Sequence, residues 1–197
     1  MSGEESFYHE PGKAVESAFT MNSFALFTDV SLNPSLKLGV GCYLLVPASF
    51  LEVPPQNIER TKAAQRLKLR RFEAVSSAEL EVRTALWAFE DCCIKASGPM
   101  KLRLYTDSQC ITGLLKRRTR LEKEGYISRK TNLALKNASL YRSFYEFHDE
   151  LGFEVIKVKG HTRSCSRNVV DNIFSFIDKE ARKALKLWIN EFESKQG

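Results

Sequence analysis

The sequence predicts one α/β domain with a mixed five-stranded sheet, in which an antiparallel meander is followed by parallel strands and helices lie on both faces. Three short segments with strand-like patterning come first, and the rest of the chain alternates between helical and strand-like periodicity. A meander followed by βα units is typical of such a sheet. The chain of 197 residues, 43% of them hydrophobic, is long enough to bury one core.

The first half of the chain predicts the meander. Residues 24–29 (FALFTD) and 38–46 (LGVGCYLLV) are apolar runs typical of buried strands. Residues 47–64 contain three of the six prolines, and we expect a long loop there. Residues 65–74 (QRLKLRRFEA) alternate between apolar and basic side chains and predict the third strand. The basic face of this strand is expected to discourage edge-to-edge pairing of sheets.

The second half of the chain predicts alternating helices and strands. Residues 76–96 have apolar side chains at helical spacing, and the sequence SGP that follows ends this helix. A charged stretch, KRRTRLEKEGYISRK, separates the next two helices. The elements expected after the first helix are a strand at 101–106, helices at 108–117 and 132–150, a strand at 153–158 and a helix at 168–194.

The composition argues against several classes of protein. The net charge of +6 and the pI of about 9.1 permit a polyanionic partner without requiring one. The five cysteines include no CxxC pair, which argues against a zinc site and favours reduced thiols in a cytoplasmic protein. We see no run of membrane-span length and no signal peptide, and no obligate protein partner is evident. Residues 1–21 are expected to form a flexible tail before a domain at 22–197.

Two strands end in the same short pattern. The chain reads LFTDVS at 26–31 and LYTDSQ at 104–109, so Asp29 and Asp107 each follow an apolar strand. If the two strands are parallel neighbours about 4.8 Å apart, the carboxylates lie side by side at one edge of the sheet. A proton or a cation relieves the repulsion between such a pair, and carboxylate oxygens suit Mg²⁺. A helix cap or a turn is the alternative for each aspartate taken alone.

Three further titratable residues lie where this fold would bring them near the same edge. Glu79 lies in the first turn of the helix at 76–96, where it also fits a capping box with Ser76. Asp171 lies in the first turn of the last helix, where an acid complements the helix dipole. His161 follows the last strand in the sequence VKGHT, and taken alone it is a solvated loop histidine.

Together, these motifs and their order resemble the ribonuclease H family. The resemblance covers about 24–185 and includes FTD-S, AEL at a helix start, YTDSQ, and KGH followed ten residues later by an aspartate. In that family, four acidic residues bind two metal ions and a loop histidine assists turnover. The resemblance therefore implies two Mg²⁺ ions, with Mn²⁺ as an alternative, bound by Asp29, Glu79, Asp107 and Asp171, and His161 in the place of the loop histidine.

The resemblance implies a metal-dependent endonuclease that hydrolyses the RNA strand of RNA–DNA hybrids. Two cations clamp the attacking and leaving oxygens of a phosphodiester, and four carboxylates neutralise much of their charge. The hybrid is the expected partner, recognised by its backbone shape and 2′-hydroxyl groups. Ser31 argues against a proofreading-type exonuclease, which carries an acid two residues after the first aspartate. A junction resolvase and a non-catalytic nucleic-acid-binding module of the same fold are the alternatives.

The expected substrate-binding residues come from the same resemblance. Two of them lie in segments that contact nucleic-acid backbone in the family, although Val30 replaces the usual glycine after the first aspartate. The stretch at 116–130 falls where the family often carries a basic protrusion. A solvated loop is the alternative there, because two glutamates dilute its positive charge. The residues expected to hold substrate are Asn33, Ser76, Arg117, Arg118 and Arg120.

Overall fold

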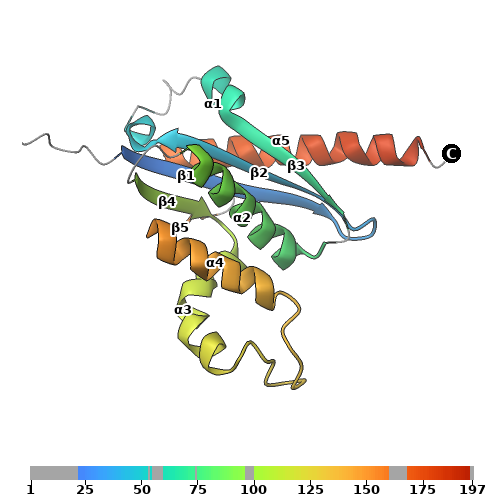
Figure 1. The fold of residues 1–197 in the computed structure, drawn as a ribbon. Helices are drawn as coiled ribbons and strands as arrows, with labels where there is room; N and C mark the ends of the chain where they lie inside the picture. Colours follow the sequence, from blue (N-terminus) through green and yellow to red (C-terminus); the bar gives the residue numbers. More distant parts are fainter. Residues whose placement is uncertain are drawn as a thin grey trace, which may run out of the picture.

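A mixed five-stranded sheet forms the centre of the molecule (Figure 1). The computed structural model describes residues 22–52, 54, 60–73, 75–95, 100–159 and 168–195. The strands are β1 (Asn22–Asn33), β2 (Leu38–Pro47), β3 (Leu67–Glu73), β4 (Met100–Thr106) and β5 (Glu154–Lys157). The helices are η1 (Ala48–Leu51, a 3-10 helix), α1 (Arg60–Arg66), α2 (Ser77–Lys95), α3 (Gln109–Lys123), α4 (Ala138–Leu151) and α5 (Val169–Glu193).

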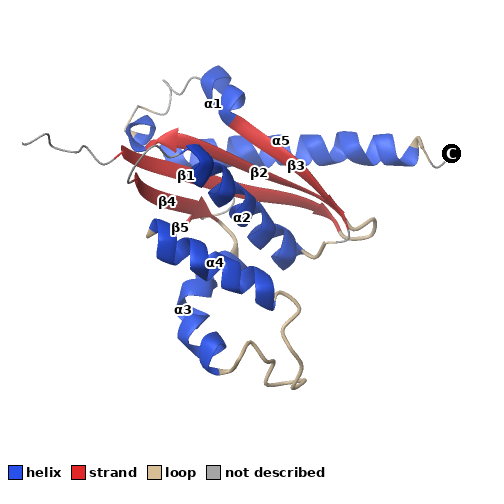
Figure 2. Ribbon diagram, viewed as in Figure 1, coloured by secondary structure: helices blue, strands red, loops and turns tan. Residues whose placement is uncertain are grey.

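The strand order is β3-β2-β1-β4-β5, which confirms the predicted fold class. Strand β2 pairs antiparallel to both β1 and β3, and the three strands form the expected meander. Strand β4 lies parallel to β1, and β5 lies parallel to β4 (Figure 2). The two strands that carry the repeated pattern are therefore direct neighbours with the same direction.

Helices cover both faces of the sheet. On β1, Ala25 and Phe27 pack in the cluster that contains the buried side chains of α5. Leu26, between them, packs instead with residues of α2, α3 and α4. This period of two follows from the pleat of a strand, which turns successive side chains to opposite faces. In Figure 1, α5 accordingly lies behind the sheet, and α2 and α4 lie in front of it.

Helix α2 approaches the sheet closely at two glycines of β2. A Cβ atom at Gly41 would lie 2.0 Å from Thr84 Oγ1, and one at Gly39 would lie 2.5 Å from Leu80 Cδ2. Neither distance is compatible with a side chain at these positions. The missing side chains therefore let the N-terminal half of α2 lie directly on the sheet, beside the end of β1.

Several element boundaries differ from the prediction. Strand β1 continues to Asn33, four residues beyond its expected end, so Asp29 lies within the strand. Residues 60–66 form α1, although 60–64 were expected in a loop and 65–66 in the third strand, and β3 begins only at Leu67. Helix α3 continues to Lys123 through the charged stretch, because Ile111, Leu114 and Leu121 are buried at helical spacing. Helix α4 begins at Ala138, later than position 132. The predicted tail at 1–21 lies outside the described residues.

The described helices include none that is both long and apolar enough to cross a membrane.

Candidate active site

Asp29 and Asp107 lie at equivalent positions of two parallel neighbouring strands. Phe27 of β1 pairs with Tyr105 of β4, and each aspartate follows two residues after that pair. Asp29 is half-buried and Asp107 is exposed, whereas the threonine before each of them is buried. The expected adjacency of β1 and β4 at this edge of the sheet is therefore confirmed.

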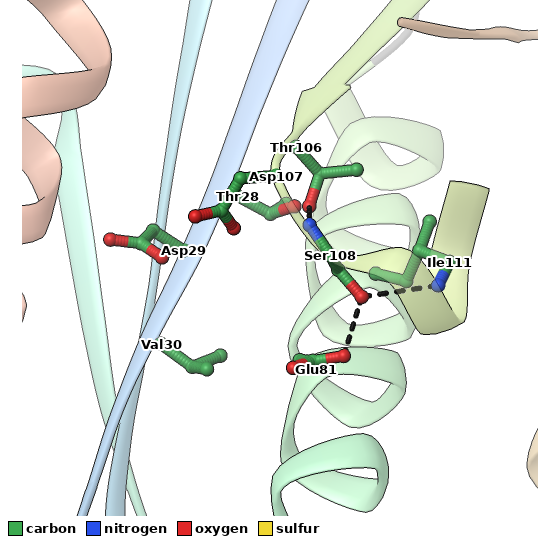
Figure 3. A pocket seen from close by; sticks show the side chains of 8 residues that line it. All are labelled: Thr28, Asp29, Val30, Glu81, Thr106, Asp107, Ser108 and Ile111. Atoms are coloured by element: carbon green, nitrogen blue, oxygen red, sulfur yellow. Dashed lines mark hydrogen bonds between the residues drawn. The ribbon is translucent and has the colours of Figure 1, made fainter. Parts of the chain in front are cut away.

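A small pocket lies between the C-terminal half of β1, the end of β4 and the helices α2 and α3. Its volume is about 10 Å³, which is room for roughly one water molecule. Figure 3 shows the side chains around it, including the carboxylates of both strand ends and one carboxylate from α2. The residues that line the pocket are Thr28, Asp29, Val30, Glu81, Thr106, Asp107, Ser108 and Ile111.

The carboxylate that α2 contributes to this pocket belongs to Glu81, not to Glu79 as the sequence suggested. Glu81 accepts hydrogen bonds from Ser108 Oγ (2.5 Å) and Ser77 Oγ (3.0 Å). The Glu79 carboxylate instead lies 3.5 Å from Arg83 Nη1 and 3.3 Å from Lys136 Nζ. Two residues along an α-helix are about 200° apart around its axis, so only one of the two glutamates can face the strand ends.

A helical pattern on α2 distinguishes the two glutamates. Ala85, Ala88 and Cys92 are buried and lie four, seven and eleven residues after Glu81, on the same side of the helix. Glu81 therefore extends a buried stripe by one turn toward the N-terminus. The stripe through Glu79 is mixed: it passes Arg83, the buried Leu86 and the exposed Glu90. This pattern was present in the sequence, but the motif AEL directed attention to Glu79, on the other side of the helix.

On α5, the acid close to the strand ends is Asp178. Asp29 faces the side of the sheet that α5 covers, because it is in phase with Ala25 and Phe27. The Ile177 carbonyl of α5 lies 3.6 Å from Cys42 Sγ, and Cys42 is the pairing partner of Asp29 on β2. Consistent with this, the charge of Asp178 contributes to raising the pKa of Asp29.

Asp171, the residue expected at this place, lies two helical turns earlier. Seven residues correspond to about 10 Å along the helix axis. There Asp171 forms a capping box with Asn168: the Asp171 carboxylate accepts from Asn168 N–H at 3.2 Å, and Asn168 Oδ1 accepts from Asp171 N–H at 2.8 Å. The two aspartates share one face of α5, so only the position along the axis separates them.

The Asp29 carboxyl group is in an unusual electrostatic environment. Burial raises the pKa of Asp29 to about 7, and the nearby Asp107 and Asp178 add to this rise. Arg182, which pairs with Asp178 at 2.8 Å, partly opposes it. Within the described residues, the buried Asp29 Oδ2 atom has no hydrogen-bond partner. A buried carboxylate oxygen without a donor is stabilised by a proton or by a cation.

The donor set around the strand ends fits a hard divalent cation. Carboxylate oxygens are the ligands that Mg²⁺ prefers, and Asp29 Oδ2 lacks another partner in the described structure. In the described part of the chain, no three His, Cys, Asp or Glu side chains converge closely enough to form a ready metal cluster. The carboxylates therefore lie around the pocket without converging on one point, and a bound cation would bring their oxygens closer together.

The two expected backbone-binding residues have local roles. Asn33 Oδ1 accepts a hydrogen bond from Leu36 N–H at 3.0 Å and so stabilises the turn between β1 and β2. Ser76 Oγ lies 3.4 Å from the Glu79 N–H and precedes the first turn of α2. Both contacts are capping interactions of the kind that Asn and Ser provide at turns and helix ends. His161 lies outside the described residues.

The three arginines expected to bind substrate form hydrogen bonds or ion pairs within the protein. Arg118 bonds to both carboxylate oxygens of Asp149 on α4 and to Glu122, and it stacks on Tyr145. Arg117 donates to the carbonyls of Gly113 and Cys110 on its own helix. Arg120 lies 3.6 Å from Glu124. Arg118 therefore ties α3 to α4, a role that its position in the sequence did not indicate.

The comparisons with known proteins agree with this architecture. No curated protein matches the chain in sequence. Among solved structures, LC9-RNase H1, a type 1 RNase H with the type 2 active-site motif, is similar with a TM-score of 0.61 at 17% identity, over 86% of this chain and 75% of that chain. The PFV RNase H domain is similar with a TM-score of 0.57 at 13% identity, over 84% of this chain and 94% of that chain.

A third solved structure is the foamy viral protease-reverse transcriptase in complex with double-stranded DNA. It is similar with a TM-score of 0.51 at 12% identity, over 79% of this chain and 92% of that chain. At these identities the three structures support the fold alone. The RNase H family model, however, matches residues 21–186, which is most of the sequence. The chain therefore belongs to the RNase H family.

Proposed function

We propose that this protein is a metal-dependent endonuclease that hydrolyses the RNA strand of RNA–DNA hybrids. The observation that carries the proposal is the gathering of carboxylates from four elements at one edge of the sheet. Membership of the RNase H family supports a nuclease of this type. The proposed metal ligands are Asp29 of β1, Glu81 of α2, Asp107 after β4 and Asp178 of α5.

This ligand set revises the one suggested by the sequence. Glu81 replaces Glu79, because Glu81 lines the pocket between the strand ends. Asp178 replaces Asp171, because the charge of Asp178 acts on Asp29. When bound, two divalent cations supply a nucleophilic water and stabilise the leaving 3′ oxygen of the phosphodiester. Mg²⁺ suits these ligands, and Mn²⁺ is the alternative.

The residues of the chain prepare the site for this chemistry. Asp29, whose pKa is about 7, gives up its proton to become a ligand. Asp178 exchanges its ion pair with Arg182 for a cation, at small cost because the Arg182 side chain is exposed to water. His161, which precedes α5 in the sequence, is proposed to move a proton or to assist product release.

Substrate binding is proposed to come from basic side chains that have no ion-pair partner within the described protein. Lys116, Lys123 and Lys130 lie on or after α3, and the described structure shows no ion pair for any of them. Their charges are available to phosphates, unlike that of Arg118. The hybrid would be recognised by backbone shape and by its 2′-hydroxyl groups.

The test is cleavage of four labelled substrates, each with and without Mg²⁺: an RNA–DNA hybrid, duplex RNA, duplex DNA and a four-way junction. We expect cleavage of the RNA strand of the hybrid, dependent on Mg²⁺ and abolished in Asp107→Asn. Preferred cleavage of the junction would identify a resolvase instead. Binding of substrates without metal-dependent cleavage of any of them would identify a non-catalytic module.

A further inference from the structure

We propose that Ser108 is a positioning residue that holds the Glu81 carboxylate in the geometry of a metal ligand and thereby sets the affinity for metal. The inference rests on the proposed function, because it concerns one of the proposed ligands. Ser108 directly follows Asp107 and lies at the N-terminus of α3, where it is buried with 6% of its surface exposed. Its hydroxyl group joins α3 to Glu81 of α2 (Figure 3).

The direction of the Ser108 hydroxyl proton follows from its other contact. Ser108 Oγ accepts the Ile111 N–H at 3.1 Å, which is the N-cap bond of α3. A serine hydroxyl has a single proton, and one lone pair is taken by this cap. The Glu81 carboxylate can only accept, so the proton is directed to Glu81 Oε2, 2.5 Å away. The cap thus aims the hydroxyl at Glu81.

The Glu81 carboxylate is held at both oxygens. Ser77, four residues earlier on α2, donates to Oε1 at 3.0 Å, and Ser108 donates to Oε2. Each carboxylate oxygen has two lone pairs, so both keep one for a cation. Hydrogen bonds of this kind fix the orientation of a ligand before metal arrives. Ser77 is exposed, so water competes with it for the hydrogen bond to Glu81. The buried Ser108 should therefore contribute more to the orientation of the Glu81 carboxylate.

Ser108 also fixes the backbone beside the next proposed ligand. Its N–H donates to Thr106 Oγ1 at 3.2 Å, and these two residues flank Asp107. One residue therefore relates the end of β4, which carries Asp107, to the side chain of Glu81. Removal of the hydroxyl should change the distance and orientation between two ligands without removing either of them.

The experiment measures binding of Mn²⁺ to the purified full chain without substrate, by calorimetry, together with the Mn²⁺ concentration that half-saturates hybrid cleavage. Ser108→Gly removes the hydroxyl but keeps most of the capping preference, and Ser108→Ala removes both. Ser108→Thr retains the hydroxyl. Ser77→Ala removes only the second hydrogen bond to Glu81. Far-ultraviolet circular dichroism and thermal melting without metal check the fold of each variant.

We expect Ser108→Gly and Ser108→Ala to bind Mn²⁺ about 10–100-fold more weakly than the unmodified chain, the range typical of residues that orient a ligand. Cleavage at saturating Mn²⁺ should recover to within a few-fold. Ser108→Thr should bind nearly normally, and Ser77→Ala should lose less affinity than Ser108→Gly.

Unchanged Mn²⁺ affinity in a folded Ser108→Gly chain would overturn this inference while leaving the proposed function intact. Equal losses of affinity in Ser108→Thr and Ser108→Ala, with both chains folded, would also overturn it, because the hydroxyl would then be irrelevant. If the unmodified chain bound no Mn²⁺ and cleaved no hybrid, the proposed function would fail, and the inference with it.

Discussion

Glu79 and Glu81, two residues apart on α2, bind different parts of the protein: Glu81 accepts from Ser108 at the end of β4, and Glu79 lies beside Lys136 and Arg83. Helical geometry turns the two side chains to nearly opposite sides. The pair provides a matched test of the proposed ligand set, since both variants carry the same chemical change.

Glu81→Gln should reduce hybrid cleavage by more than about a hundredfold, since removal of a ligand should cost more than the 10–100-fold typical of residues that support one. Glu79→Gln should change the cleavage rate only a few-fold, because its contacts are partly exposed ion pairs. Steady-state cleavage at saturating Mg²⁺ measures both. The reverse ranking of the two variants would return the ligand role to Glu79.

Asp178→Ala and Asp171→Ala form a second matched pair, two turns apart on α5. Asp178→Ala should lose metal binding and cleavage, with little change in stability because its ion-pair partner Arg182 is exposed to water. Asp171→Ala should keep most activity but lower stability by about 0.3–1 kcal/mol, since it removes an acid from the first turn of the helix. Calorimetric Mn²⁺ binding and urea unfolding of the same preparations separate the two effects. An inactive Asp171→Ala chain of normal stability would contradict this assignment.

The metal-free protein should lose stability as the pH rises from about 4 to above 7. The pKa of Asp29 in the folded protein, about 7, lies above its value in the unfolded chain, so the folded state retains a proton that the unfolded state releases. This contribution is complete below the unfolded pKa and is lost as the pH rises through 7. Each pKa unit corresponds to about 1.4 kcal/mol.

Asp29→Asn is the control for this pH dependence. In the presence of a chelator, the variant should be at least as stable as the unmodified chain at pH 8, and its stability should vary less between pH 4 and pH 8. Addition of Mg²⁺ at pH 8 should stabilise the unmodified chain and not the variant. Parallel pH profiles for the two chains in urea unfolding would show that Asp29 titrates normally.

The affinity for substrate should depend on the lysines on or after α3 more than on the three arginines of α3. Replacing Lys116, Lys123 and Lys130 with Ala should flatten the plot of log affinity against log salt by roughly 0.7–0.9 for each phosphate that the variant no longer neutralises. Replacing Arg117, Arg118 and Arg120 should change the slope less and should lower stability, because Arg118 links α3 to α4. Hybrid binding to a cleavage-deficient Asp107→Asn chain at several salt concentrations measures both slopes. If only the arginine variant flattened the plot, the arginines would be the residues that bind phosphate.

Gly41→Ala should destabilise the protein, because the new Cβ atom would lie 2.0 Å from Thr84 Oγ1. Overpacking of this kind typically costs about 1–3 kcal/mol. Gly113→Ala, in the N-terminal half of α3, is the control: the atoms nearest to its Cβ atom would belong to the side chain of Arg117, at 3.5 Å, and Ala favours helix over Gly. Urea unfolding should therefore show reduced stability in the first variant and no reduction in the second.

The sequence by itself determined the order of the five strands and of the helices from α2 onward, the mixed sheet, and the two aspartates that follow the apolar runs of β1 and β4. These features depend on local patterns, since the period of two in a strand and the residue after its last apolar position can be recognised within a few residues. The pairing of β1 with β4 was a condition in the sequence argument, and the sheet topology supplies it.

Only the tertiary structure decided which acid of each helix reaches those aspartates. An amphipathic helix can place an acid on the sheet edge at more than one turn, and its rotation and axial position are set by packing. Buried Ala85, Ala88 and Cys92 turn Glu81 toward Ser108. Contact of Ile177 with Cys42 brings Asp178, two turns beyond Asp171, beside Asp29. The tertiary structure also decided which basic side chains of α3 are bound within the protein. The partner of Arg118 is Asp149, thirty-one residues away on another helix.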